Sequence, residues 1–413
     1  MNPINAKPEF ADNLPKRHIA GKIWSNLFRI STGVGIVALI ALLLNITNSA
    51  FGYVAIENRI DPESLAINGI PLEQLHSIDL TYILKQNVSA GYFRNLENKM
   101  PFEQRTREEI YDLVIERVVE PKAVSTWLLF DSLFYKSQIQ AEAAEKYPNA
   151  DLYFTSWLNG NFIVSPQSAN AERAGVRTAV LGSLWVIAIT LLFAFPMGVG
   201  AAIYLEEYAG DFWINRLIQT NINNLAGVPS IIYGILGLAI FVRALEPVTS
   251  GAFLGTMDPT TANGRTIMSA GLTLGLLILP LIIINAQEAL RAVSNSLRQA
   301  SFGLGATKWQ TIWHHVLPNA IPGILTGTIL SISRALGETA PLVVVGASTF
   351  ITFDPESPFS KFTTLPIQIY QWTSRPQAEF RNIAAAAILV LLMILLSLNA
   401  VAVVLRNKYS KQV

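Results

Sequence analysis

The residues best suited to chemistry lie inside an otherwise apolar stretch of the chain. Between Trp309 and Phe353 the only acidic or basic residues are Arg334 and Glu338. Ionisable side chains at bilayer depth cost about 2.5–3.5 kcal/mol each on insertion scales, and they normally face a bundle interior or a water-filled path. A spacing of four residues predicts that the two side chains share one helical face.

The chemistry of this pair has two interpretations. The planar guanidinium of Arg334 suits a tetrahedral oxyanion, with Glu338 fixing its orientation. Alternatively, the two charges form an intramembrane ion pair that only holds helices together. Gly337 removes a side chain beside them, and Pro341 cannot donate to the carbonyl of Gly337, so we expect a kink at this point.

Long apolar runs must position this pair. The 413 residues are 51% hydrophobic and only 14% charged, against about 25% charged in soluble domains. About 20 apolar residues cross a bilayer as a helix. Six runs are free of charge apart from the pair described above: 30–56, 178–205, 217–242, 266–287, 309–353 and 382–405. The sequence therefore predicts an all-α membrane protein with six transmembrane helices. The first run exceeds the h-region of a cleaved signal peptide, so we interpret it as the first span.

Composition excludes several classes of function. The net charge of +1 gives no general attraction to nucleic acid, and no cysteine is present for disulfides, thiol catalysis or thiolate metal sites. Four scattered histidines do not suggest a metal centre. Short segments on one side of the predicted spans are rich in Lys and Arg, notably 1–29 and 406–413, whereas 244–264 has none. The positive-inside rule therefore predicts that both termini are cytoplasmic.

A segment of different composition separates the first two spans. Residues 57–175 carry 11 Lys and Arg and 17 Asp and Glu, a charge density typical of soluble domains. Long loops cross the membrane regardless of charge, so this insert is predicted to be extracytoplasmic. Its negative net charge argues against direct recruitment of an anionic solute, and we expect a docking or structural role.

The segment 287–318, between the fourth and fifth spans, is patterned like two short amphipathic helices. Apolar residues recur at helical spacing from Leu290 to Leu304, and a second apolar stripe runs from Trp309 to Val316. Gly303 and Gly305 interrupt the pattern, because glycine disfavours helix and permits sharp turns. We expect a compact elbow on the cytoplasmic face; a surface hairpin without special function is the alternative.

The residues of this elbow resemble the cytoplasmic loop of permease subunits of bacterial ATP-binding-cassette importers. The family pattern is Glu-Ala-Ala, three residues, Gly, nine residues, Ile, one residue, Leu-Pro. Ala300, Gly305, Leu317 and Pro318 match at that spacing, while Gln299, Ser301 and His315 depart from it. The resemblance implies a coupling helix that inserts into a separate ATPase, involving Gln299, Ala300, Gly303, Gly305, Leu317 and Pro318.

The stretch from Ser333 to Leu342 resembles the signature of the PstA family of phosphate-importer permeases, as do Gly198 to Tyr208 and Asn223 to Gly237. The resemblance covers about 176–405 and implies a type I importer permease core, with the insert outside it. It further implies a sister PstC-like permease, a PstB-like ATPase dimer and a periplasmic PstS-like phosphate-binding protein, in a bacterial inner membrane.

The chain has no G-x-x-x-x-G-K-[ST] phosphate cradle, so we expect no enzymatic activity and no bound cofactor, with ATP used by the partner subunit. The sequence thus predicts a phosphate-importer permease with Arg334, Glu338 and Thr339 on the substrate pathway. Molybdate or sulfate import is the nearest alternative, and a membrane sensor using the insert as ligand domain is another.

Overall fold

The computed structural model describes residues 14–255 and 264–410, which are mostly helical. Parts of the predicted N-terminal segment 1–29, of the loop 244–264 and of the tail 406–413 lie outside these residues. Among the described residues, five helices are long and apolar enough to cross a membrane, and a bent pair would make a sixth. The five are α1 (Leu14–Ala50), α8 (Arg177–Ile203), α12 (Ile267–Arg291), α15 (Leu317–Gly337) and α18 (Ala378–Ser410).

The helix predicted for 30–56 ends six residues early, because Phe51–Glu57 forms strand β1 directly after Ala50. A charge-free run can continue as a strand once a sheet pairs with it, and pairing here fixes the boundary. β1 is the middle strand of a three-stranded sheet, between β2 (Lys122–Thr126) and β3 (Asp151–Ser156), and both pairings are antiparallel. The predicted insert is therefore a mixed helical and β structure.

The run 217–242 is not one straight helix. It is divided into α9 (Trp213–Ala226) and α10 (Ser230–Gly237), which continues as η6 (Leu238–Ala244), and the two parts are bent by 106°. The break falls at Gly227-Val-Pro229. Pro229 has no N–H and restricts the residue before it to extended backbone, so the helix stops there. The span predicted over 217–242 is thus a bent pair of helices.

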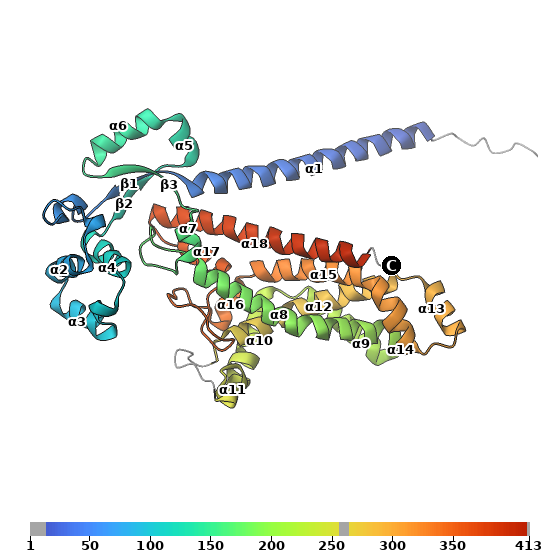
Figure 1. Ribbon diagram of the computed structural model, residues 1–413. Helices are drawn as coiled ribbons and strands as arrows, with labels where there is room; N and C mark the ends of the chain where they lie inside the picture. Colours follow the sequence, from blue (N-terminus) through green and yellow to red (C-terminus); the bar gives the residue numbers. More distant parts are fainter. Residues whose placement is uncertain (1–13, 256–263, 411–413) are drawn as a thin grey trace, which may run out of the picture.

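The insert has two lobes on either side of the sheet (Figure 1). The first lobe lies between β1 and β2 and has its own apolar core, which includes Leu80, Leu84, Ile110 and Val114. Its elements are η1 (Pro62–Leu65), η2 (Leu72–Gln74), α2 (Ser77–Asn87), α3 (Ala90–Lys99), η3 (Phe102–Gln104), α4 (Arg107–Val114) and η4 (Ile115–Val119). The second lobe is α5 (Leu129–Phe134) and α6 (Lys136–Lys146), and α7 (Gly160–Val164) follows β3.

The sheet is joined to the membrane helices by one continuous apolar core. Val54 and Trp157 from the sheet region, together with Ala50 at the end of α1, pack with Trp372 and Phe380. These last two belong to α17 (Leu365–Thr373) and α18. The insert therefore packs directly against the end of the helical bundle.

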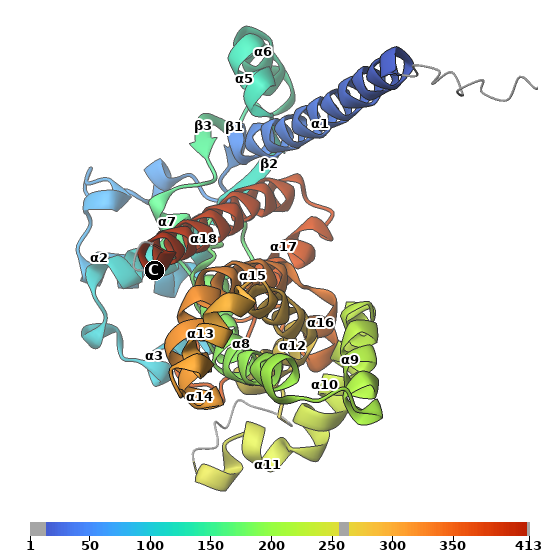
Figure 2. The ribbon, with the colours of Figure 1, turned by 90° about the vertical axis from the view of Figure 1, so that its right-hand side faces the viewer.

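Seen end-on, α12 lies between α8, α15 and α16 (Ala340–Val345), as Figure 2 shows. Small residues permit this close packing: a Cβ at Gly271 of α12 would come within 2.6 Å of the Ile189 side chain on α8. The buried Thr190 hydroxyl donates to the Gly271 carbonyl at 3.0 Å, across the same contact. By contrast, α1 packs on α18 but leaves its apolar side chains exposed, including Leu39 at 68%.

The remaining elements lie in connections. Between α10 and α12 are η6, α11 (Glu246–Thr249) and η7 (Ala252–Leu254). After α8 comes η5 (Tyr204–Tyr208), and the segment after α12 contains α13 (Asn295–Gly303), α14 (Lys308–Thr311) and η8 (Ile312–Val316).

Candidate functional site

The predicted charged pair lies at the end of a helix. α15 stops at Gly337, and Glu338 is its C-terminal cap with extended backbone (φ −74°, ψ 127°). A new helix, α16, begins at Ala340 with Pro341 in its first turn. Proline is favoured in a first turn because its missing N–H would have no helical partner there. The kink expected at Pro341 is thus a full break, and Glu338 and Thr339 lie within it.

Arg334 and Glu338 face one another across this break. The Arg334 Nε and the Glu338 Oε1 are 3.5 Å apart, and the side chains are 46% and 17% exposed. The contact uses Nε alone; within the described chain, the two terminal guanidinium nitrogens make no hydrogen bond. The geometry leaves the outer edge of the guanidinium available to another group.

α10 fixes the position of the break. A Cβ at Gly234 would lie 2.7 Å from the Pro341 Cα and 3.1 Å from its carbonyl oxygen, so only glycine permits the approach. The Tyr233 hydroxyl donates to the Leu225 carbonyl at 2.8 Å, which ties α10 back to α9 across their bend. The two segments singled out around Tyr233 and Arg334 in the sequence therefore pack against each other.

Thr339 is not brought to the charged pair. It is half-buried and lines a groove of about 580 Å³ between α10, α16, α17 and α18, whose other lining residues include Val343, Tyr370 and Leu391. No hydrogen bond joins Thr339 to Arg334 or Glu338 in the described ranges. Of the three predicted pathway residues, Arg334 and Glu338 thus form a charged pair, whereas Thr339 lines the mainly apolar groove.

The elbow predicted at 287–318 is present, and the hydrogen bonds define the type of its turn. α13 ends in a Schellman motif: the Ala306 N–H donates to the Ser301 carbonyl at 3.2 Å and the Gly305 N–H to the Phe302 carbonyl at 2.9 Å. Gly305 takes the left-handed conformation that this motif requires, with φ +81°. Gly303, in contrast, is an ordinary helical residue at the end of α13.

The second arm of the elbow starts with a capping box. The Thr307 side chain accepts from the Gln310 N–H, and the Gln310 side chain accepts from the Thr307 N–H. The Ser301 and Thr311 hydroxyls are hydrogen-bonded at 2.8 Å in a buried position and join the two arms. These contacts make the elbow a single rigid unit.

The apolar stripes of the elbow are divided between inside and outside. α12 and α13 are separate helices, so Leu290 is buried while Leu304 is 91% exposed. Ile312 and Val316 are buried, but Trp309 and Trp313 are 55% and 53% exposed and stack with ring centroids 5.4 Å apart. The apolar spacing from Leu290 to Leu304 predicted one amphipathic helix, but the turn at 292–294 divides this stretch between α12 and α13.

The outer surface of the elbow combines polar and large apolar groups. Gln299 and Ala300 are exposed beside Phe302 and Leu304, and Leu317 and Pro318 begin α15. Solvent-exposed aromatic and leucine side chains on one rigid turn are typical of a protein-binding surface.

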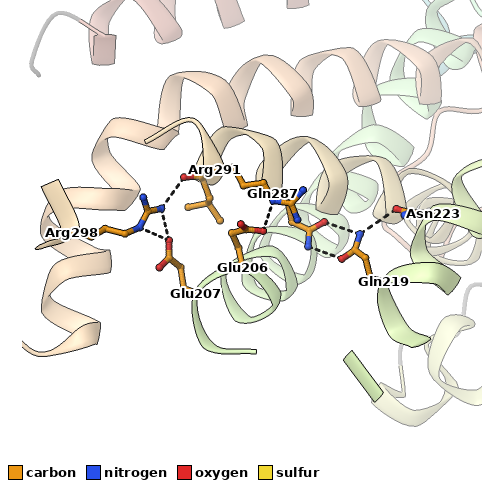
Figure 3. A network of polar contacts seen from close by, with 8 residues as sticks. Glu206, Glu207, Gln219, Asn223, Gln287, Arg291 and Arg298 are labelled. Atoms are coloured by element: carbon orange, nitrogen blue, oxygen red, sulfur yellow. Dashed lines mark hydrogen bonds and ion pairs between the residues drawn. The ribbon is translucent and has the colours of Figure 1, made fainter. Parts of the chain in front are cut away.

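The sequence analysis missed a polar network on the inner side of the elbow (Figure 3). Arg298 Nη2 contacts Glu207 Oε1 at 2.7 Å, with side chains only 15% and 9% exposed. Arg291 Nε contacts Glu206 Oε2 at 2.8 Å, with exposures of 60% and 19%. The two adjacent acids and the two arginines are visible in the sequence, but Arg291 and Arg298 lie on different helices, so their spacing gave no helical signal.

The same network continues to α9. The side-chain amides of Gln219 and Gln287 exchange hydrogen bonds, at 3.1 Å and 2.8 Å, and Gln219 also reaches Asn223 at 3.2 Å. Gln287 is 3% exposed, so the reciprocal bonds satisfy an amide that would otherwise be buried without partners.

The long apolar helices give the chain the character of a multi-pass membrane protein. The chain belongs to the family described as "Binding-protein-dependent transport system inner membrane component", whose profile matches residues 194–411. This family membership places it among the permeases of ATP-binding-cassette importers.

Curated relatives agree with the family assignment. The chain is 31% identical to the probable ABC transporter permease protein YqgI of Bacillus subtilis, over 59% of this chain and 83% of that protein. It is 36% identical to phosphate transport system permease protein PstA 1 of Mycobacterium tuberculosis, over 56% of this chain and 70% of the relative. A bacterial alginate ABC importer of known structure aligns with a TM-score of 0.43 and 18% identity, over 66% of this chain and 90% of that chain.

Proposed function

We propose that this protein is the permease subunit of an inorganic phosphate importer. The observation that carries the proposal is the Ser333–Leu342 segment, which resembles the PstA signature and forms a helix break with a partly open charged pair. Relatives named PstA at 31–36% identity support it, including those of Yersinia pestis and Mycobacterium tuberculosis.

In this proposal Arg334 contacts phosphate as it passes. Its guanidinium offers a planar fork of donors that matches two oxygens of a tetrahedral anion. Glu338 holds the guanidinium through Nε and leaves the terminal nitrogens for the solute. Nearly half of the Arg334 side chain is exposed in the single chain, so a sister permease of the PstC type would complete the opposite wall of the path.

Energy reaches the path through the elbow. We propose that the exposed surface around Gln299, Ala300 and Leu304 docks in a partner ATPase of the PstB type, which binds and hydrolyses the ATP. A periplasmic binding protein of the PstS type would deliver phosphate on the insert side. The proposal places both termini in the cytoplasm of a bacterial cell, from the excess of Lys and Arg in the short segments on that side.

The proposal is tested by transport in proteoliposomes that contain the complete complex. Uptake of labelled phosphate that depends on ATP and on the binding protein is the expected result. Excess unlabelled phosphate should compete, whereas equal concentrations of molybdate or sulfate should not. Preferential uptake of molybdate or sulfate would assign the subunit to another oxyanion importer, and a complex that binds ATP without transporting any oxyanion would refute the proposal.

A further inference from the structure

On its inner side the elbow contacts the short segment η5, in addition to the Gln219–Gln287 pair that joins it to α9. Three of its five residues contact the elbow: Glu206 pairs with Arg291, Glu207 pairs with Arg298, and the Tyr208 ring lies 5.1 Å from the Lys308 Nζ. η5 is the direct continuation of α8. The elbow is therefore attached both to its chain neighbours α12 and α15 and to the end of a helix almost 100 residues earlier in sequence.

The two ion pairs are not equivalent. Arg291 is 60% exposed, and an exposed pair of this kind contributes little to a fixed geometry. Arg298 is 15% exposed, and it uses both Nε and Nη2 on the same Glu207 oxygen, at 3.2 Å and 2.7 Å. A buried, charge-assisted and two-point contact fixes the orientation of both side chains.

Arg298 also connects α13 to the end of α12. Its Nη1 donates to the Val293 carbonyl at 2.7 Å and its Nη2 to the Leu290 carbonyl at 2.9 Å. The Leu290 carbonyl lies in the last turn of α12 and also accepts from the Val293 N–H at 3.3 Å, and the Val293 carbonyl lies just beyond the helix. One guanidinium thus holds three elements together: α12, α13 and η5.

The far end of α8 is fastened at the insert. Arg177, its first residue, pairs with Asp354 at 2.9 Å and donates to the Val164 carbonyl at 2.8 Å. Ala179, two residues further on, belongs to the apolar core that joins the sheet to α17 and α18. α8 and η5 together form one apolar helical run of 32 residues between these two attachments.

We propose that Glu207 and Arg298 are positioning residues that make α8 a transmission element. In this view the pair compels the elbow and α8 to move together, so that closure of the partner ATPase is conveyed to the insert side of the membrane. The Glu206–Arg291 pair lies on the same two elements, but transmission does not depend on it. This inference rests on the proposed function, from which it takes phosphate as the solute. The quantity that it predicts is the number of ATP molecules used for each solute molecule transported.

The test is Glu207→Gln in the complete reconstituted complex, with Glu206→Gln as matched control on the adjacent residue. Glutamine keeps the size of the side chain and removes the charge. For Glu207→Gln we expect normal assembly and ATP hydrolysis, but about a tenfold rise in ATP used per phosphate transported, within the range usual for coupling between two sites. Arg298→Lys, which keeps charge but loses the fork, should raise the same ratio. Glu206→Gln should leave it within about twofold.

The outcomes separate the two proposals. If the unmodified complex fails to transport phosphate, the proposed function fails, and the ratio can still be measured with whichever solute it carries. An unchanged ratio in Glu207→Gln, with assembly intact, overturns the transmission role. If Glu207→Gln fails to assemble, Arg298→Lys is measured in its place, and a normal ratio of ATP used to phosphate transported in that variant overturns the role as well. An equal rise in Glu206→Gln would also overturn it, by showing that surface charge and not the buried pair is responsible.

Discussion

Replacing Gly305 tests the coupling role of the elbow with a known backbone cost. Its φ of +81° is accessible to glycine but costs other residues about 1–2 kcal/mol, and a β-branched side chain is the least tolerant. A Cβ at this position would meet no atom within 4 Å, so the penalty of Gly305→Val arises from the backbone alone. Since 1.4 kcal/mol is a factor of about ten in population, the Schellman turn should be lost in a large fraction of molecules.

Gly303 provides the matched control. It too has no atom within 4 Å of a built Cβ, but its backbone is helical. Gly303→Ala should therefore be neutral or slightly stabilising, by up to about 1 kcal/mol. We expect Gly305→Val to insert and assemble, while phosphate uptake and stimulated ATP hydrolysis fall together by about five- to tenfold in proteoliposomes. Normal transport in Gly305→Val would refute the coupling assignment, and an equal loss in Gly303→Ala would show that the left-handed backbone at Gly305 is not the cause of the loss.

Three further predictions follow from the pair, the insert and a buried acid. Arg334→Lys should reduce phosphate uptake at least about tenfold with assembly intact. The double variant Arg334→Gln with Glu338→Gln should restore assembly without restoring uptake, and restored uptake would show that the pair is purely structural. Replacing residues 58–121 with a short Gly/Ser turn should preserve helix insertion, because Glu57 and Lys122 are paired neighbours in the sheet, and loss of all expressed protein would contradict this. Burial, aided by Glu379, raises the pKa of Glu172 to about 7. Between about pH 4.5 and 7 the folded state therefore binds more protons than the unfolded state, and stability falls as the pH rises. Glu172→Gln should raise the melting temperature at pH 8 but not at pH 5, and equal shifts at both pH values would contradict this prediction.

The sequence predicted those elements whose signals are local. Charge-free runs located the five long helices. The turn at Gly305 was also predicted, because glycine between two helical patterns has few other uses. In each case the residue itself determines the backbone.

Features that depend on distant partners were not predicted. β1 pairs with Lys122–Thr126 and Asp151–Ser156, and the point at which the apolar run changes from helix to strand depends on these distant partners. Arg298 and Glu207 are 91 residues apart, and single-sequence patterns carry no information on that pairing. The division of the charged pair across a break required the packing of α10 on Pro341, which again is a tertiary contact.

The position of β1 in the middle of its sheet has a consequence for the order of events during synthesis. β3 ends at Ser156, and α8 begins only at Arg177, so all three strands are made before any later transmembrane helix is complete. Pairing of the three strands can thus hold the end of α1 in the sheet while the remaining helices are still unmade. A substitution that unpairs β1, such as a proline at Val54, should therefore act early, by releasing α1 from a partly made chain, and the later helices would assemble around a misplaced first span.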